Sequence, residues 1–69
     1  MAKDKQTGAM LTTGDVARIF DVHPSTVRRW SEQGILAAYR SNPRAMRKFR
    51  REDVAALFLE RALRRHLEE

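Results

Sequence analysis

The side chains best suited to polar chemistry gather within one short stretch, at Ser25, Thr26, Arg28 and Arg29. The same stretch contains Val27 and Trp30, two apolar residues at the i, i+3 spacing of one helix face. At about 100° per residue, a helix that buries this pair turns both arginines outward, with Ser25 beside them and Thr26 on the flank. A guanidinium can form two parallel hydrogen bonds to guanine, and a hydroxyl can reach bases or phosphates. We therefore expect this helix to enter the major groove of a duplex.

A second group of cations lies between residues 40 and 51 and comprises Arg40, Arg44, Arg47, Lys48, Arg50 and Arg51. So many positive charges in a short segment repel one another unless a polyanion neutralises them. We expect Arg40, Arg44, Arg47 and Lys48 to contact phosphates or the minor groove. Phe49 and Tyr39 are expected to pack into the core, because one aromatic residue per strand is too few to stack single-stranded bases.

The start of the preceding helix supplies further polar groups. Thr12 and Asp15 have the spacing of a capping box, in which each side chain accepts a hydrogen bond from the backbone of the other residue. Helix starts attract anions, and we expect Thr12 and Thr13 to contact a phosphate there. Glu32, near the end of the second helix, also faces outward, where phosphate would repel it unless it accepts a hydrogen bond from cytosine.

These groups require two helices joined by a tight turn. The first helix carries its apolar residues on one face, at Val16, Ala17, Ile19 and Phe20. Asp21 then occupies a turn position where glycine is common, and aspartate tolerates the positive φ that such a position requires. Pro24 can begin the second helix with His23 as its cap, and Gly34 can end that helix after about Gln33.

The remaining residues predict a hairpin and a third helix. Residues 35–40 and 46–50 flank a turn at residues 41–44, which indicates a small β-hairpin. From about Glu52, a final helix carries Val54, Leu57 and Phe58 toward the core. A further row follows at Leu59, Leu63 and Leu67. This row either completes the core or forms a contact between copies of the chain.

Length and charge limit the class of protein. Sixty-nine residues suffice for one domain, and we assign residues 1–10 to a disordered arm and residues 11–69 to the domain. Residues 11–51 hold nine Lys or Arg against three carboxylates, whereas residues 52–69 hold three against five. A basic body with a mildly acidic final helix favours a polyanion as the partner. The sequence contains neither a membrane span nor a signal peptide, so we expect a cytoplasmic protein.

The residue types of the sequence do not favour a catalytic function. The chain has no cysteine, and its two histidines, His23 and His66, are far apart in the sequence. Neither a Ser-His-Asp arrangement nor a carboxylate pair in a pocket-forming context is present. We therefore expect no enzyme, no metal site and no cofactor.

Three segments together resemble the MerR-type winged helix-turn-helix: Leu11 to Ala17, Ser25 to Trp30 with Gly34-Ile35-Leu36, and Arg47 to Val54. The chain is most similar to the short, stand-alone branch that contains excisionases and BldC-like regulators. The resemblance implies a mainly α fold with a β-hairpin wing, the second helix in the major groove, and the wing on the adjacent backbone or minor groove. It places Thr26 and Arg28 at positions that commonly touch DNA. It also implies several copies along one site and no small-molecule effector, because the effector region of longer relatives is absent.

Three functions fit these features. The first is a sequence-preferring binder of double-stranded DNA that regulates transcription at the nucleoid. The second is an excisionase-like architectural protein that bends DNA for a recombinase. The third is an adaptor whose basic surface binds an acidic protein. DNA is preferred over RNA because the aromatic signatures of RNA-binding domains are missing.

Overall fold

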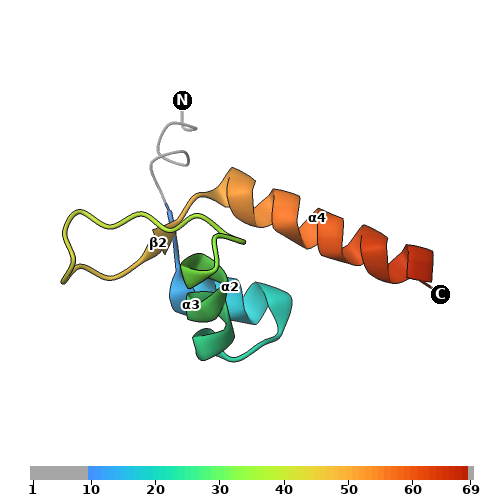
Figure 1. Ribbon diagram of the computed structural model, residues 1–69, viewed down its shortest axis with the longest axis horizontal. Coiled ribbons are helices and arrows are strands. Elements are labelled where there is room, and N and C mark those ends of the chain that lie inside the picture. Colours follow the sequence, from blue (N-terminus) through green and yellow to red (C-terminus); the bar gives the residue numbers. More distant parts are fainter. Residues whose placement is uncertain (1–9, 69) are drawn as a thin grey trace.

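The computed structural model describes residues 10–68, which form three helices and two short strands (Figure 1). In chain order these are β1 (Leu11–Thr12), α2 (Thr13–Phe20), α3 (Pro24–Glu32), β2 (Lys48–Phe49) and α4 (Arg51–Glu68). The fold is a mainly α winged helix-turn-helix, as the sequence predicts. The predicted arm falls outside the described residues except for Met10.

Helix α2 begins at the predicted capping box. The Thr12 N–H donates to Asp15 Oδ2 and the Asp15 N–H donates to Thr12 Oγ1, both at 3.1 Å. The helix ends at Asp21, whose φ of 59° lies in the left-handed region. The Val22 N–H then donates to the Ala17 carbonyl at 3.0 Å, which closes the last turn. Both ends of α2 are therefore fixed by local hydrogen bonds.

The hydrogen bonds of the capping box make the stability of the fold depend on pH. The Thr12 backbone N–H, followed by the Thr12 hydroxyl and Arg18, lowers the pKa of the Asp15 carboxyl below its ordinary value of 3.8. A carboxyl with a lowered pKa in the folded state stabilises the fold above its unfolded pKa, and this contribution is lost as the pH falls from about 4 through the folded value. We expect the melting temperature to decrease in that range. Asp15→Asn keeps a side-chain acceptor without the charge, so its thermal melts between pH 3 and 7 should show a shallower decrease. An equally steep decrease would contradict this role.

Helix α3 is capped as expected. The His23 side chain accepts a hydrogen bond from the Ser25 N–H through Nδ1 at 3.1 Å, and Pro24 follows in the first turn. At the other end Gly34 adopts a φ of 77°. The Ile35 N–H donates to the Trp30 carbonyl at 2.8 Å, which satisfies an acceptor at the helix end. The cap sets the direction in which the chain leaves α3 toward the wing.

The core contains eight buried apolar residues, contributed by the three helices, by β2 and by the segment after α3: Val16, Ala17, Val27, Trp30, Leu36, Phe49, Val54 and Leu57. The predicted inward positions of Val27, Trp30 and Phe49 are confirmed. Phe58 and Tyr39 were expected in the core but are about half exposed, as is Ile19 on the predicted apolar face of α2. Ile19 and Phe58 are at the edge of a core too small to cover them, and Tyr39 lies on the loop beyond it.

The predicted hairpin is only partly correct. Lys48 pairs with Tyr39 through a single bridge, with backbone hydrogen bonds of 2.8 and 3.0 Å. The regular partner of β2 is instead β1, in an antiparallel pair with Leu11 opposite Phe49 and Thr12 opposite Lys48. Residues 35–38 form no strand, because the cap of α3 and the burial of Leu36 determine their path. The intervening loop, which we call the wing loop (residues 40–47), projects from one end of the molecule (Figure 1).

The leucine row of α4 does not complete the core. Leu59, Leu63 and Leu67 are 67%, 55% and 73% exposed. Val54 and Leu57 occupy the opposite face of the helix, and the last turns project beyond α2 and α3 (Figure 1). None of the helices within residues 10–68 has the length and apolar character needed to cross a membrane.

Candidate nucleic-acid interface

Helix α3 presents a polar outer face because its inner face is fully used. Val27 and Trp30 are 0% and 7% exposed, whereas Arg28 and Arg29 are exposed. Within residues 10–68, the ion pairs formed by arginines involve neither Arg28 nor Arg29. Both guanidinium groups therefore retain their donors for a ligand.

The first turn of α3 is more constrained. Ser25 and Thr26 are half-buried. The Ser25 hydroxyl lies 2.9 Å from His23 Nδ1, so the same imidazole nitrogen orders the backbone and the side chain of Ser25. Thr26 is held through its N–H, which donates to the His23 carbonyl at 2.9 Å. These two residues thus form a rigid end of the outer face.

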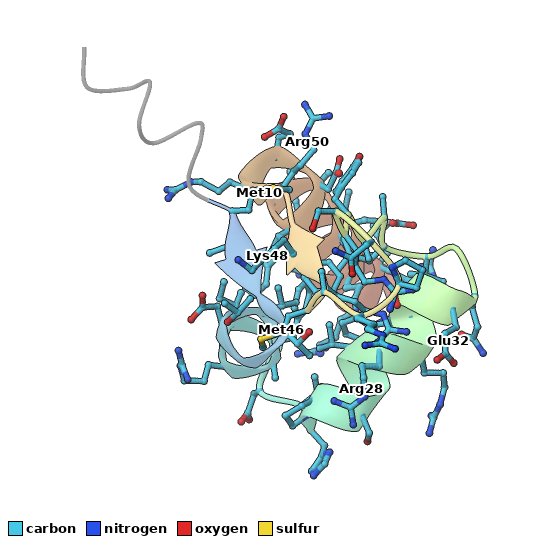
Figure 2. All side chains as sticks on the ribbon, turned by 90° about the vertical axis from the view of Figure 1, so that its left-hand side faces the viewer. Met10, Arg28, Glu32, Met46, Lys48 and Arg50 are labelled. Atoms are coloured by element: carbon cyan, nitrogen blue, oxygen red, sulfur yellow. The ribbon has the colours of Figure 1, made fainter. Side chains whose placement is uncertain are left out.

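The strand register joins two groups that are far apart in the sequence. Thr12 lies opposite Lys48 in the antiparallel pair, so an exposed ammonium is next to the start of α2. Thr13 begins that helix, and the Thr12 hydroxyl already accepts the Asp15 N–H. A cation beside a helix N-terminus is a favourable environment for a phosphate. Figure 2 labels Lys48 at the strands and Arg28 on α3.

Arg47 differs from the other cations of residues 40–51, which we call the wing cations. Its side chain is only 21% exposed, and its guanidinium lies 3.5 Å from Glu32 Oε2 near the end of α3. This pair connects the wing to the outer face of α3 (Figure 2 labels Glu32). It also partly neutralises the carboxylate that we expected phosphate to repel.

The other wing cations are exposed, and two of them have partners. Arg40 donates to the Pro43 carbonyl at 3.3 Å, across the tip of the wing loop. Arg50 lies 5.9 Å from the centre of the Tyr39 ring and pairs with Glu52. The Tyr39 hydroxyl, followed by Glu52, raises the pKa of Arg50. Arg44 is fixed through its backbone, where its N–H donates to Asn42 Oδ1 at 2.9 Å. This bond fixes the backbone of Arg44 in the wing loop.

The site predicted from the sequence does not include two exposed apolar residues in or next to the wing loop, Met46 and Tyr39. Met46 is exposed next to the cations of the wing (Figure 2), and Tyr39 forms a shallow hollow with it. The pairing of Tyr39 with Lys48 places both apolar side chains on the surface. Their position depends on this bridge, and no spacing rule in the sequence indicates it. Within residues 10–68, His, Asp and Glu side chains form no group of three that could hold a metal ion.

Comparison with known protein families gives a match over most of the chain. A family model described as a helix-turn-helix domain matches residues 10–68, a span that includes all five elements. No curated protein sequence matches the chain. The match thus covers α2, the turn at Asp21, α3, the wing loop and α4 together.

Proposed function

Because this chain belongs to the family of helix-turn-helix domains, which bind DNA, we propose that it is a sequence-preferring binder of double-stranded DNA that regulates bacterial transcription. In this proposal α3 enters the major groove and the wing loop contacts the adjacent backbone or minor groove. The start of α2 contacts a phosphate through Thr12, Thr13 and Lys48. The protein acts as a binding module in the cytoplasm, at the nucleoid, without a cofactor or effector.

One observation carries the proposal. Arg28 and Arg29 are exposed on the helix whose other face buries Val27 and Trp30. The core therefore fixes the orientation of the helix while leaving the guanidinium groups free to bond bases. Arg bonded to guanine O6 and N7 is the commonest specific contact in the major groove.

Selection from a random duplex library, followed by footprinting, tests the proposal. We expect one enriched motif, protection of the major groove over that motif, and affinity that falls as salt increases. An adaptor for an acidic protein would show no enriched motif. Its binding to a labelled duplex would disappear when unlabelled DNA of random sequence is added as a competitor. That result would reject the proposal.

An excisionase-like role uses the same contacts and differs in what happens to the DNA. A bend of tens of degrees at the selected site would favour an architectural protein, whereas a nearly straight site would favour a regulator. Circular-permutation mobility assays measure this bend directly. A recombinase gene next to the coding sequence would support the architectural role.

The wing is expected to supply affinity without base preference. Replacing Arg40, Arg44 and Lys48 with alanine should weaken binding to all sequences alike and reduce the slope of log K against log salt by about 0.9 per lost phosphate contact. Arg47→Ala should alter this slope less, because Glu32 holds the Arg47 guanidinium. The control for Arg47→Ala is Arg65→Ala, which removes one charge from the face of α4 opposite the leucine row. Salt titrations with a cognate and a random duplex provide the measurement, and an unchanged slope in the triple variant would remove the wing from the interface.

More than one copy is proposed to bind each site, through the leucine row of α4. Leu59, Leu63 and Leu67 form an exposed apolar row, beside which Glu60 and Arg64 pair at 2.8 Å. Since these opposite charges neutralise each other, two copies can approach along the row without repulsion. A second copy also adds the contacts that one small module lacks.

Leu63→Glu should abolish this association and make DNA binding non-cooperative, while leaving the fold intact because Leu63 is exposed. The matched control is Ile35→Glu. Ile35 is also exposed but lies outside α4, so this substitution should leave the association unchanged. Sedimentation velocity and the Hill coefficient of duplex binding give the two readouts. Cooperative binding by the Leu63 variant would contradict the proposed contact.

A further inference from the structure

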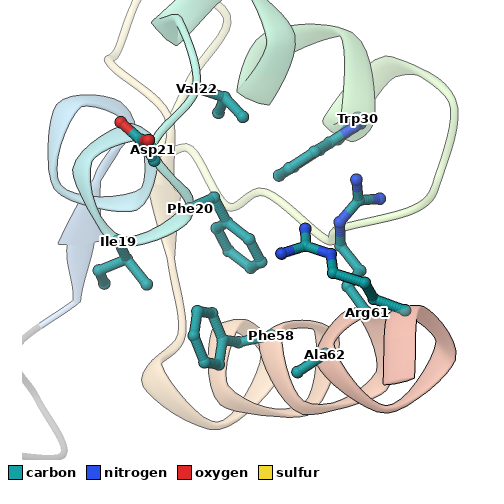
Figure 3. A pocket seen from close by; sticks show the side chains of 9 residues that line it. Ile19, Phe20, Asp21, Val22, Trp30, Phe58, Arg61 and Ala62 are labelled. Atoms are coloured by element: carbon teal, nitrogen blue, oxygen red, sulfur yellow. The ribbon is translucent and has the colours of Figure 1, made fainter. Parts of the chain in front are cut away.

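An aromatic groove lies between the helix-turn-helix unit and α4. It has a volume of about 430 Å³, and its principal walls are Ile19, Phe20, Trp30, Phe58, Arg61 and Arg65. Figure 3 shows these walls: the side chains of Phe20, Phe58 and Trp30 converge on the space, with Arg61 beside Trp30. Its lining residues come from α2 and the turn after it, from α3 and from α4, and include no residue of the wing loop.

The aromatic side chains form a continuous wall. The Phe20 and Trp30 rings meet edge to face with centroids 5.1 Å apart, and the Phe20 and Phe58 centroids are 5.5 Å apart. Within this wall Trp30 is the most buried side chain, whereas Phe58 and Ile19 remain about half-exposed. Apolar surface that stays open in a groove is suited to an apolar side chain from another molecule.

The rim of the groove is basic. The Arg61 guanidinium lies 4.9 Å from the centre of the Trp30 ring. Arg65 follows one turn later on the same helix face, and the ion pairs among residues 10–68 include neither of the two. Asp21 is the one carboxylate among the lining residues, and it lies across the groove from Arg61 (Figure 3). The charge of the rim therefore favours a ligand that brings carboxylates.

We propose that this groove docks an acidic amphipathic segment of a partner protein. The apolar side chains of the segment contact Phe20 and Phe58, and its carboxylates pair with Arg61 and Arg65. A second copy of this chain fits less well, because its own α4 would bring the same arginines to the rim. Nucleic acid also fits less well, because its sugars and phosphates would leave the half-exposed Ile19 and Phe58 without an apolar contact.

Trp30 provides a direct readout, since it is the only tryptophan of the chain and lines the groove. The probe is a short synthetic peptide with Leu or Phe at i, i+3, i+4 and i+7 and Asp or Glu elsewhere. The control peptide has lysine at each acidic position. We expect a saturable change in Trp30 fluorescence with the acidic peptide and none with the lysine peptide. Absence of a saturable change would overturn the proposal.

Two pairs of variants localise the binding. Arg65→Glu should weaken the acidic peptide about tenfold, whereas Arg64→Glu makes the same charge change outside the groove and should retain binding. Ile19→Ser should weaken the peptide, whereas Ile35→Ser should not, although the two residues are similarly exposed at 44% and 48%. Equal losses within either pair would overturn the proposal.

Two further outcomes would identify another occupant. A change in Trp30 fluorescence with protein concentration alone, if it persists in Leu63→Glu, would indicate a second copy in the groove. A loss of duplex affinity and of salt slope in Arg65→Glu, as large as the loss of peptide affinity, would indicate DNA. Either result would overturn the docking proposal without affecting the proposed role of α3, which is tested separately by the selected duplex.

Discussion

Replacing Trp30 with alanine is expected to unfold the protein. Trp30 is 7% exposed, its ring meets Phe20 edge to face, and the Arg61 guanidinium covers it. Removing a buried indole costs about 3–5 kcal/mol through lost burial and the cavity that remains. A domain of this size has a stability near the low end of about 5–15 kcal/mol, so the substitution should remove most or all of that stability and lower the melting temperature steeply.

Circular dichroism during urea or thermal unfolding measures this effect. Leu67→Ala is the matched control, because it truncates a large apolar side chain on the outer face of α4 and should change the free energy of unfolding by less than about 0.5 kcal/mol. Trp30→Phe should fall between these variants, since it retains an aromatic ring against Phe20. A Trp30→Ala variant as stable as Leu67→Ala would refute the core described above.

Loss of both outward arginines of α3 is expected to have the largest effect on binding. Arg28→Ala and Arg29→Ala should each cost about 1–3 kcal/mol at the preferred duplex, and base preference should relax at the positions that they contact. Affinity for a random duplex should fall far less, because the wing and the start of α2 still contact phosphates. The fold should be unaffected, since both side chains are exposed.

Fluorescence anisotropy with the selected and a random duplex gives the ratio of the two affinities. A matched control is the double variant Arg18→Ala and Arg65→Ala, which removes the same charge from surfaces outside the proposed interface. This control should lower both affinities slightly and leave their ratio unchanged. If the Arg28 and Arg29 double variant bound the selected duplex like the unaltered chain, α3 would not be the element that reads bases.

The sequence predicted the helix-turn-helix unit well because local interactions determine it. Thr12, Asp21, His23 and Gly34 each fix a helix end through hydrogen bonds to backbone groups within a few residues. The outward orientation of Arg28 then follows from the burial of its neighbours, without any long-range information.

The wing could not be predicted to the same degree because its pairing is non-local. Lys48 bonds Tyr39, but it also lies opposite Thr12, which is far away in the sequence. Two-residue strands have too short an alternation to reveal a partner. The contact between Arg47 and Glu32 likewise depends on where the wing packs. The exposure of the leucine row depends on how far α4 extends beyond the core.

The caps at both ends of α3 also bear on how base preference can evolve. Its outer side chains contribute to neither the core nor the cap at Gly34, so substitutions at Arg28 and Arg29 should be nearly neutral for stability. If α3 reads bases as proposed, exchanging these residues one at a time should change the preferred duplex sequence without compensating mutations elsewhere. Ser25 is the exception, because it shares its histidine with the cap, and we expect adaptive change at this position to be slower.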